Sequence, residues 1–128
     1  MGSTRSVANT SAFENLKSRG LEIISNDTLR QAITNVYSNV YYSMVDFETK
    51  DDHQHQYQVL WPEVIKALNI TEMWQEGKPI DNQRIKKNYP FRNAVTTNIF
   101  FRKYMIERYN GLNKSVNELI KKIDQELK

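Results

Sequence analysis

The sequence predicts an all-α protein, in which two long helices form an antiparallel hairpin, a short N-terminal helix packs alongside, and an irregular connector joins the long helices. Apolar residues recur at alternating steps of four and three through two long stretches, a spacing typical of amphipathic helices. The segment between these stretches is punctuated by Gly77, Pro79 and Pro90, which favour turns and loops. Because 128 residues is the usual size of one domain, we expect a disordered tail over 1–10 and a single helical domain over 11–128.

The short N-terminal helix is predicted to begin at Ser11. Ser11 followed three residues later by Glu14 matches a capping box, in which the two residues satisfy backbone N–H groups at the start of a helix. Phe13 and Leu16 then give the helix an apolar side. Gly20 is predicted to end this helix, because glycine readily adopts the left-handed conformation found after helix C-termini.

A junction to the next helix follows Gly20. Residues 21–24 are mostly apolar, but no second strand is evident to pair with them, and an isolated strand would leave backbone polar groups without partners. We therefore predict a buried connector here. Asn26 is a good N-cap, and Asp27 places a carboxylate near the positive end of the following helix.

The first long helix, which is the second helix along the chain, is predicted over about 27–68. At about 1.5 Å per residue it would be roughly 60 Å long. Its apolar side continues in phase through a polar interval in the middle, which favours one helix over two. Pro62 predicts a kink or a break near Leu60, since an interior proline removes a hydrogen bond and clashes with the preceding turn. The predicted inner side comprises Ile33, Tyr37, Val40, Met44, Phe47, Asp51, Gln54, Gln58, Trp61, Ile65 and Leu68.

The second long helix is predicted to begin after Pro90 and to run to the C-terminal region. Ile120 and Leu127 widen its apolar side, so we expect this helix to face more than one partner helix. Its main seam comprises Met105, Tyr109, Leu112, Val116, Leu119 and Ile123.

Composition excludes several kinds of chemistry. The absence of cysteine rules out disulfides, thiol nucleophiles and cysteine-ligated metals. A formal net charge of +3, from 18 Lys and Arg against 15 Asp and Glu, is too small to indicate a nucleic-acid or lipid partner by itself. No apolar run approaches the roughly 18 to 20 residues that span a bilayer. Serine-nucleophile, dinucleotide-binding and P-loop motifs are missing, so we predict a non-enzymatic protein without a cofactor.

Two alternatives rest on small clusters of side chains. Asp51 and His55 stand four residues apart, a spacing that can hold a divalent metal on a helix and would suit a metal-dependent enzyme, but no third ligand is evident. Arg84, Lys86 and Lys87 adjoin aromatic residues and could bind single-stranded nucleic acid weakly.

Three aromatic residues are the candidates for contact with a partner. Trp74 lies in the irregular connector, and Tyr89 and Phe91 flank Pro90 at its end. A large side chain in such a segment either holds the loop in place or meets another molecule. In contrast, Gly20, Asn26, Asp27 and Pro62 are predicted to have structural roles only.

The stretch SAFENLKSRGLEIISNDTLRQAITNVYS, residues 11–38, follows a recognisable pattern: a small residue, an aromatic, a Leu-Lys pair, a glycine and an apolar segment leading into SND-x-LR. KPID at 78–81, FRN at 91–93 and ELIKKIDQEL at 118–127 fit the same pattern. In these motifs the chain resembles a family of bacterial proteins of unknown function, in which a transmembrane helix near the N-terminus precedes an extracytoplasmic helical domain. The resemblance implies a periplasmic location at the inner membrane and an anchor upstream of this segment, and it supplies no catalytic residues.

These observations predict a helical interaction or sensory module on the outer side of a bacterial inner membrane. Its partner would be another protein or a second copy of the chain, with a small ligand as the alternative.

Overall fold

The computed structural model describes residues 5–72 and 75–128, and these residues are predominantly helical, which confirms the all-α class. Contacts divide the chain into two compact units. Among the described residues, unit 1 holds 47–104, and unit 2 holds 5–46 together with 105–128. Within the described part of the chain, no helix is long and apolar enough to cross a membrane.

The described elements are helices that follow one another along the chain, together with two short strands. A short antiparallel pair joins β1 to β2, with Leu68 opposite Pro79 and Asn69 opposite Lys78. The sequence did not predict this pair, because two-residue strands are too short to show alternation. The elements are α1 (Ser11–Arg19), η1 (Leu21–Ile23), α2 (Asp27–Asn35), η2 (Val36–Tyr41), α3 (Tyr42–Phe47), η3 (Glu48–Asp52), η4 (His55–Leu60), α4 (Trp61–Ala67), β1 (Leu68–Asn69), β2 (Lys78–Pro79), α5 (Asn82–Lys86) and α6 (Tyr89–Glu126).

Every residue from 27 to 67 is helical, so the break expected near Leu60 is absent from the secondary structure. The segments η2, η3 and η4 are π-helical, with hydrogen bonds that reach one residue further back than in an α-helix. At the end of η4, the Trp61 backbone N–H donates to the Gln56 carbonyl. Pro62 then falls in the first turn of α4, where a missing N–H donor is tolerated.

The π-helical segments change which residues are buried. A repeat of four residues drifts by about 40° per step on an α-helix, or about 160° over four steps, whereas a π turn takes more residues and cancels part of this drift. The predicted positions Asp51, Gln54, Gln58 and Ile65 are consequently exposed, and the predicted inner side was wrong here. The buried positions are Glu48, Asp52, Gln56, Leu60 and Val64.

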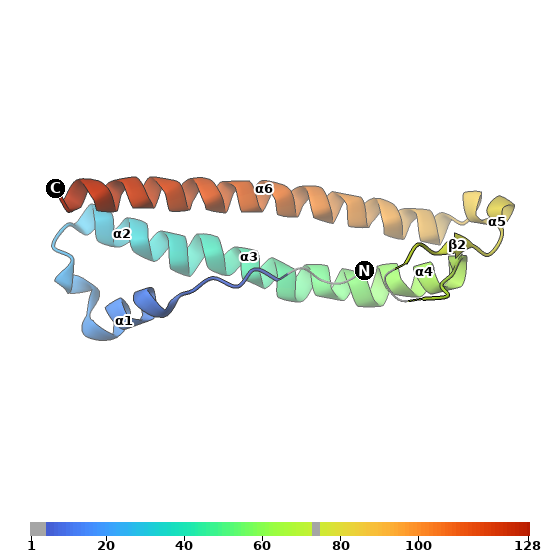
Figure 1. Cartoon of the computed structure of the whole chain (residues 1–128), viewed down its shortest axis with the longest axis horizontal. Helices are drawn as coiled ribbons and strands as arrows, with labels where there is room; N and C mark the ends of the chain where they lie inside the picture. Colours follow the sequence, from blue (N-terminus) through green and yellow to red (C-terminus); the bar gives the residue numbers. More distant parts are fainter. Residues whose placement is uncertain (1–4, 73–74) are drawn as a thin grey trace. The chain divides into compact units, whose positions relative to one another are not determined.

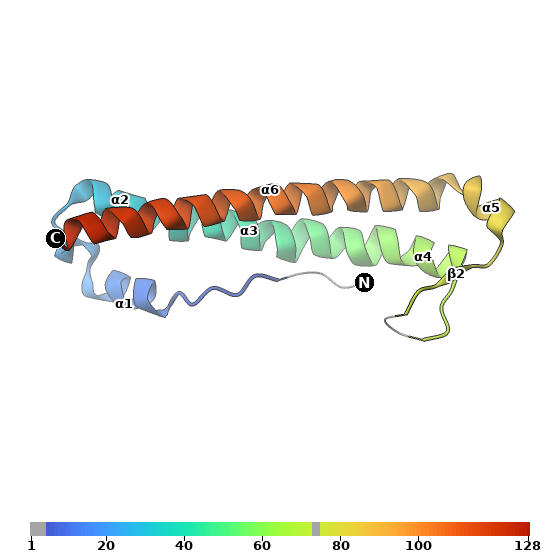
Figure 2. The same ribbon diagram turned by 45° about the horizontal axis from the view of Figure 1, so that its top comes forward.

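Unit 2 has its core between α2, η2, α1 and the C-terminal part of α6. Phe13 of α1 stacks on Tyr37 with ring centroids 4.5 Å apart. Asn26 Nδ2 donates to Glu126 Oε2 over 2.7 Å at one end, and Arg108 donates to Ser43 Oγ further along. The two long segments of unit 2 therefore lie side by side and run in opposite directions (Figures 1 and 2). The buried core residues are Phe13, Leu29, Ile33, Val36 and Leu119.

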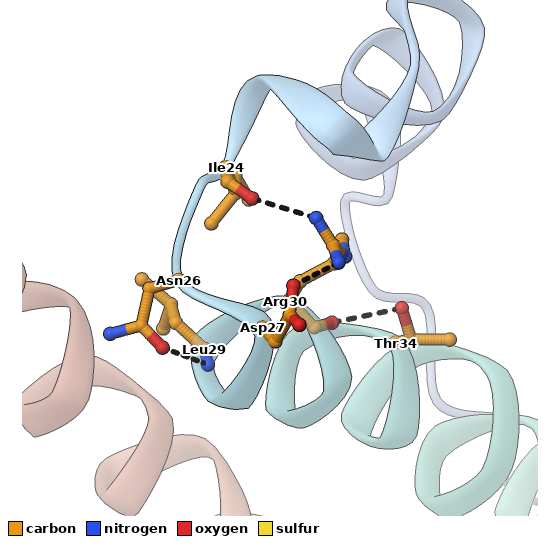
Figure 3. A network of polar contacts seen from close by, with 6 residues as sticks. All are labelled: Ile24, Asn26, Asp27, Leu29, Arg30 and Thr34. Carbon is orange, nitrogen blue, oxygen red and sulfur yellow. Dashed lines mark hydrogen bonds and ion pairs between the residues drawn. The ribbon is translucent and has the colours of Figure 1, made fainter.

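The junction between α1 and α2 has the predicted helix end and N-cap, but the prediction of a buried connector was wrong, since no residue of η1 is buried and Ile23 is 67% exposed. Gly20 ends α1 with φ of +93°, in the region that favours glycine. Leu29 donates its backbone N–H to Asn26 Oδ1 over 3.1 Å, which confirms Asn26 as the N-cap. Arg30 pairs with Asp27 and also donates to the Ile24 carbonyl over 3.0 Å, so the connector and the first turn of α2 are tied together (Figure 3).

Unit 1 has a small apolar core at the end that carries the connector. Leu60 and Val64 pack with Ala94 of α6, and all three side chains are buried. Partly buried neighbours surround them, including Phe91 and Ile70. This core holds η4 and α4 against the first turns of α6 (Figure 2).

Asn26→Ala is expected to lower the free energy of unfolding by about 1 kcal/mol, because the Leu29 N–H loses its cap acceptor. Urea unfolding followed by circular dichroism measures this change. Glu126→Ala is the matched control, since it removes the other hydrogen bond of Asn26 and leaves the cap intact. A loss for Asn26→Ala no larger than that of the control would contradict the role of the cap.

Candidate functional site

A cluster of polar side chains is buried in the middle of unit 1. Glu48, Asp52, His55 and Gln56 project from η3 and η4, and each is 5% exposed or less. The polar interval of the sequence therefore contributes four side chains to the interior, at positions other than the predicted Asp51, Gln54 and Gln58. We call these residues, together with Asn98 and Arg102 of α6, the polar cluster.

Hydrogen bonds connect the polar cluster across the two helical segments of unit 1. Arg102 forms an ion pair with Asp52 Oδ1, whose side chain is fully buried. Gln56 Nε2 donates to Asn98 Oδ1 over 2.6 Å, and Arg102 Nε donates to the same oxygen over 3.4 Å. Since a buried charge is costly without a counter-charge and hydrogen bonds, these contacts make the burial of Asp52 tolerable.

Two atoms of the polar cluster have no hydrogen-bond partner among the described residues: Asp52 Oδ2 and His55 Nε2. The His55 ring lies against Phe101 with centroids 4.7 Å apart. Burial lowers the pKa of His55 below its ordinary value of 6.5, and the Arg102 charge acts in the same direction. Hydrogen bonding to the Ala94 backbone and the Asp52 charge oppose this shift without cancelling it.

The metal site suggested by Asp51 and His55 gains no further ligand from the structure. Asp51 is exposed, whereas His55 is buried in the polar cluster. In the part of the chain that the structure describes, no group of three or more His, Cys, Asp and Glu side chains could hold a metal ion. The chemistry that the polar cluster supports is the holding of a buried carboxylate by a partly exposed guanidinium.

The basic residues Arg84, Lys86 and Lys87 lie exposed on α5 and at its end. Asp81 caps α5 by accepting from the backbone N–H groups of Arg84 and Gln83, and these bonds lower the pKa of Asp81. A hollow of about 360 Å³ beside α5 is lined by both acidic and basic side chains, including Glu63, Lys66, Asp81 and Arg84. Acidic groups thus interrupt the positive charge here.

The aromatic candidates occupy different surroundings. Tyr89 is exposed, and the Arg92 guanidinium lies 6.0 Å from its ring centre. Phe91 packs against the apolar core of unit 1, so it serves the interior. Trp74 lies outside the described residues.

An apolar groove of about 450 Å³ runs along unit 2 and is the second candidate site. Its walls come from η2, the C-terminal half of α6 and the extended residues 6–9. Tyr41 positions the extended segment, because its hydroxyl accepts from the Ala8 N–H over 2.9 Å and donates to the Ser6 carbonyl over 3.4 Å. The groove is lined by Ser6, Val7, Ala8, Asn9, Val36, Tyr37, Tyr41, Leu112, Val116, Leu119, Ile120 and Ile123.

Sequence reasoning found the groove only in part and missed the polar cluster. Ile120, which was predicted to widen the apolar side of the second long helix, lies in the groove wall, whereas the expectation of more than one partner helix stays a prediction. Asp52 and Gln56 were missed because the predicted seam placed Asp51 and Gln54 on the inner side. A strict four-residue spacing from Glu48 to Val64 was the available signal.

Comparisons with protein-family models, with curated proteins and with solved structures found no match to this chain. The family resemblance of residues 11–38 therefore stays a prediction.

Stability is expected to fall as the pH drops through the ordinary histidine pKa of 6.5. The unfolded chain protonates His55 there, whereas the folded chain resists protonation until lower pH, so the unfolded state binds more protons. His55→Gln should flatten this part of the curve of unfolding free energy against pH. His53→Gln, at an exposed position of the same helix, should leave the slope unchanged. Equal slopes for wild type and His55→Gln would contradict the shift.

Arg102→Met is expected to lower the free energy of unfolding by about 2–3 kcal/mol, because Asp52 would stay buried without its counter-charge. The double variant Asp52→Leu with Arg102→Met should recover most of this loss, since no buried charge remains. Denaturant unfolding of the single and double variants measures both values. A double variant as unstable as Arg102→Met would show that the ion pair is not the source of the loss.

Proposed function

We propose that this protein is a non-enzymatic helical interaction module that binds an apolar helix of a protein partner in the groove of unit 2. The observation that supports this proposal is the groove itself, whose walls are mainly aliphatic and tyrosine side chains. Apolar, concave surfaces with a few polar groups are the usual binding sites for amphipathic helices.

The packing of α1 shows how such a helix could bind. Phe13 and Leu16 of α1 pack on the core of unit 2. The groove shares Val36, Leu119 and Ile123 with that core. On the N-terminal side of α1, the extended residues 6–9 are the part of the chain that lines the groove. An incoming helix would therefore meet the kind of surface that already binds α1.

We also propose that the helical pairs of both units belong to one antiparallel hairpin that shares α6. Support comes from the direction of contacts in each unit by itself. In unit 2 the pairs are Asn26 with Glu126 and Ser43 with Arg108. In unit 1, Asp52 pairs with Arg102, and Gln56, which comes later in the chain, pairs with Asn98, which comes before Arg102. The two segments therefore run in opposite directions within this unit.

The periplasmic side of a bacterial inner membrane is the proposed location, and its support is the family resemblance of residues 11–38. The two alternative functions have weaker support. The metal-dependent enzyme would need Asp51 and His55 to meet, but one side chain is exposed and the other is buried. Weak nucleic-acid binding through α5 would have to overcome the neighbouring Glu63 and Asp81.

Titration with the apolar fluorescent dye 1-anilinonaphthalene-8-sulfonate tests the groove. The folded protein should bind the dye saturably, and Val116→Gln should weaken binding by about tenfold, because it places an amide in the groove wall. Val59→Gln is the matched control, since Val59 lies in unit 1 and the two valines are 44% and 37% exposed. Circular dichroism confirms that each variant is folded.

Loss of dye binding in both valine variants, or in neither, would contradict the groove as the binding surface.

A further inference from the structure

A stripe of exposed residues runs along one side of α6 in unit 2. It consists of Ile106, Asn113 and Ile120, spaced by seven residues, and we call it the α6 stripe. The isoleucine side chains are 59% and 49% exposed, and Asn113 is exposed as well. Since seven residues are nearly two helical turns, these side chains follow one another along the helix with a drift of only about 20° per repeat.

The α6 stripe has apolar ends and an amide-bearing centre. Asn117 Nδ2 donates to Asn113 Oδ1 over 3.4 Å, and Asn110 lies one turn before Asn113 on the same side. Read from either end, the order along the stripe is therefore isoleucine, asparagine, isoleucine. A two-fold symmetric contact requires such self-complementarity, because each copy supplies the same patch.

We propose that a second copy of this chain covers the α6 stripe, with the two α6 helices antiparallel about a two-fold axis at Asn113. This inference goes beyond the proposed function, because it names the partner of a surface that adjoins the groove and shares only Ile120 with it. Ile106 of one copy packs on Ile120 of the other, and the Asn113 amides meet at the axis. A polar residue at the centre of an apolar helix interface fixes the register, since any shift would bury an amide against isoleucine.

Charges beside the α6 stripe favour the antiparallel direction. Glu107, Lys114 and Lys121 each follow a stripe residue by one position, and all are exposed. In the antiparallel arrangement, Glu107 of one copy lies opposite Lys121 of the other. A parallel two-fold arrangement would instead place the two flanks on opposite sides of the interface, where Glu107 of one copy meets neither charge of the other.

Among the three flanking charges, Lys114 lies nearest the two-fold axis, and it has an acidic neighbour on its own helix. Lys114 Nζ lies 4.0 Å from Glu118 Oε1, one turn further along α6. The two Lys114 side chains of a dimer therefore bring their own counter-charges to the axis. The stripe thus combines exposed apolar area, a register-fixing centre and complementary flanks.

Sedimentation of the full chain over a range of concentrations tests the dimer. A monomer–dimer equilibrium is expected, and Ile106→Asn should raise the dissociation constant about tenfold or more, because it removes apolar contact at two symmetric places. Ile65→Asn is the matched control, since Ile65 is 52% exposed and lies in unit 1. Monomer at every concentration, or equal weakening by both variants, would overturn the proposal.

Chemical cross-linking tests the direction of the two helices. The chain has no cysteine, so single replacements Asn110→Cys and Asn117→Cys can be joined by a short bismaleimide. The antiparallel dimer predicts that a mixture of the two variants cross-links far better than either variant alone. Cross-links within each single variant, without enrichment in the mixture, would overturn the antiparallel arrangement.

Exchanging the charges at Glu107 and Lys121 tests the antiparallel arrangement independently of cross-linking. Glu107→Lys and Lys121→Glu should each weaken the dimer, and the double variant should restore it, because the opposed pairs keep opposite signs. Weakening that persists in the double variant would contradict the pairing. Dye binding in the groove distinguishes the two proposals: a monomer that still binds dye through Val116 retains the proposed function and loses only this dimer.

Discussion

The spacing of buried residues from Glu48 to Val64 is the constraint on which unit 1 depends. Five side chains, each four residues after the last, all lie inside, and several of them contact α6. An unmodified α-helix would turn the last of them to the opposite side. The π-helical segments η3 and η4 reduce this mismatch, so the ion pair of Asp52 and the apolar contacts of Leu60 can form on one helix side. They also let the chain continue helically into Pro62.

The polar cluster is costly for a unit of this size. Aliphatic side chains at Asp52 and Gln56 would pack without desolvating a charge, and buried ion pairs often contribute less to stability than such replacements. What the polar cluster does provide is a single register. Asn98 accepts a hydrogen bond from Gln56, and Arg102 forms an ion pair with Asp52. Sliding α6 by one turn would therefore leave the buried Asp52 carboxylate without its counter-charge. Protonation of His55 would add a further charge beside the ion pair of Asp52 and Arg102.

The surfaces follow from building a unit out of two long helical segments. A pair of helices can bury only part of a wide apolar side, so the remainder needs another element. In unit 2, α1 covers one end through Phe13 and Leu16, and the groove continues from there. The α6 stripe adjoins the groove on the same helix: Ile120 belongs to both, whereas Ile106 does not line the groove. One helix thus offers an internal seam, a groove wall and an exposed stripe.

The sequence by itself determined the features that arise from local chemistry. Asn26 caps α2, Gly20 ends α1, and most of the predicted α6 seam is at least partly buried, because capping, backbone freedom and a regular α-helical period act within a few residues. The inner side of the first long helix was decided only by tertiary structure. Phase there depends on where π turns occur, and the buried side makes contacts such as Gln56 with Asn98, which are 42 residues apart in the chain. The four-residue spacing from Glu48 to Val64 is visible in the sequence, but the spacing alone does not say which side of the helix is buried.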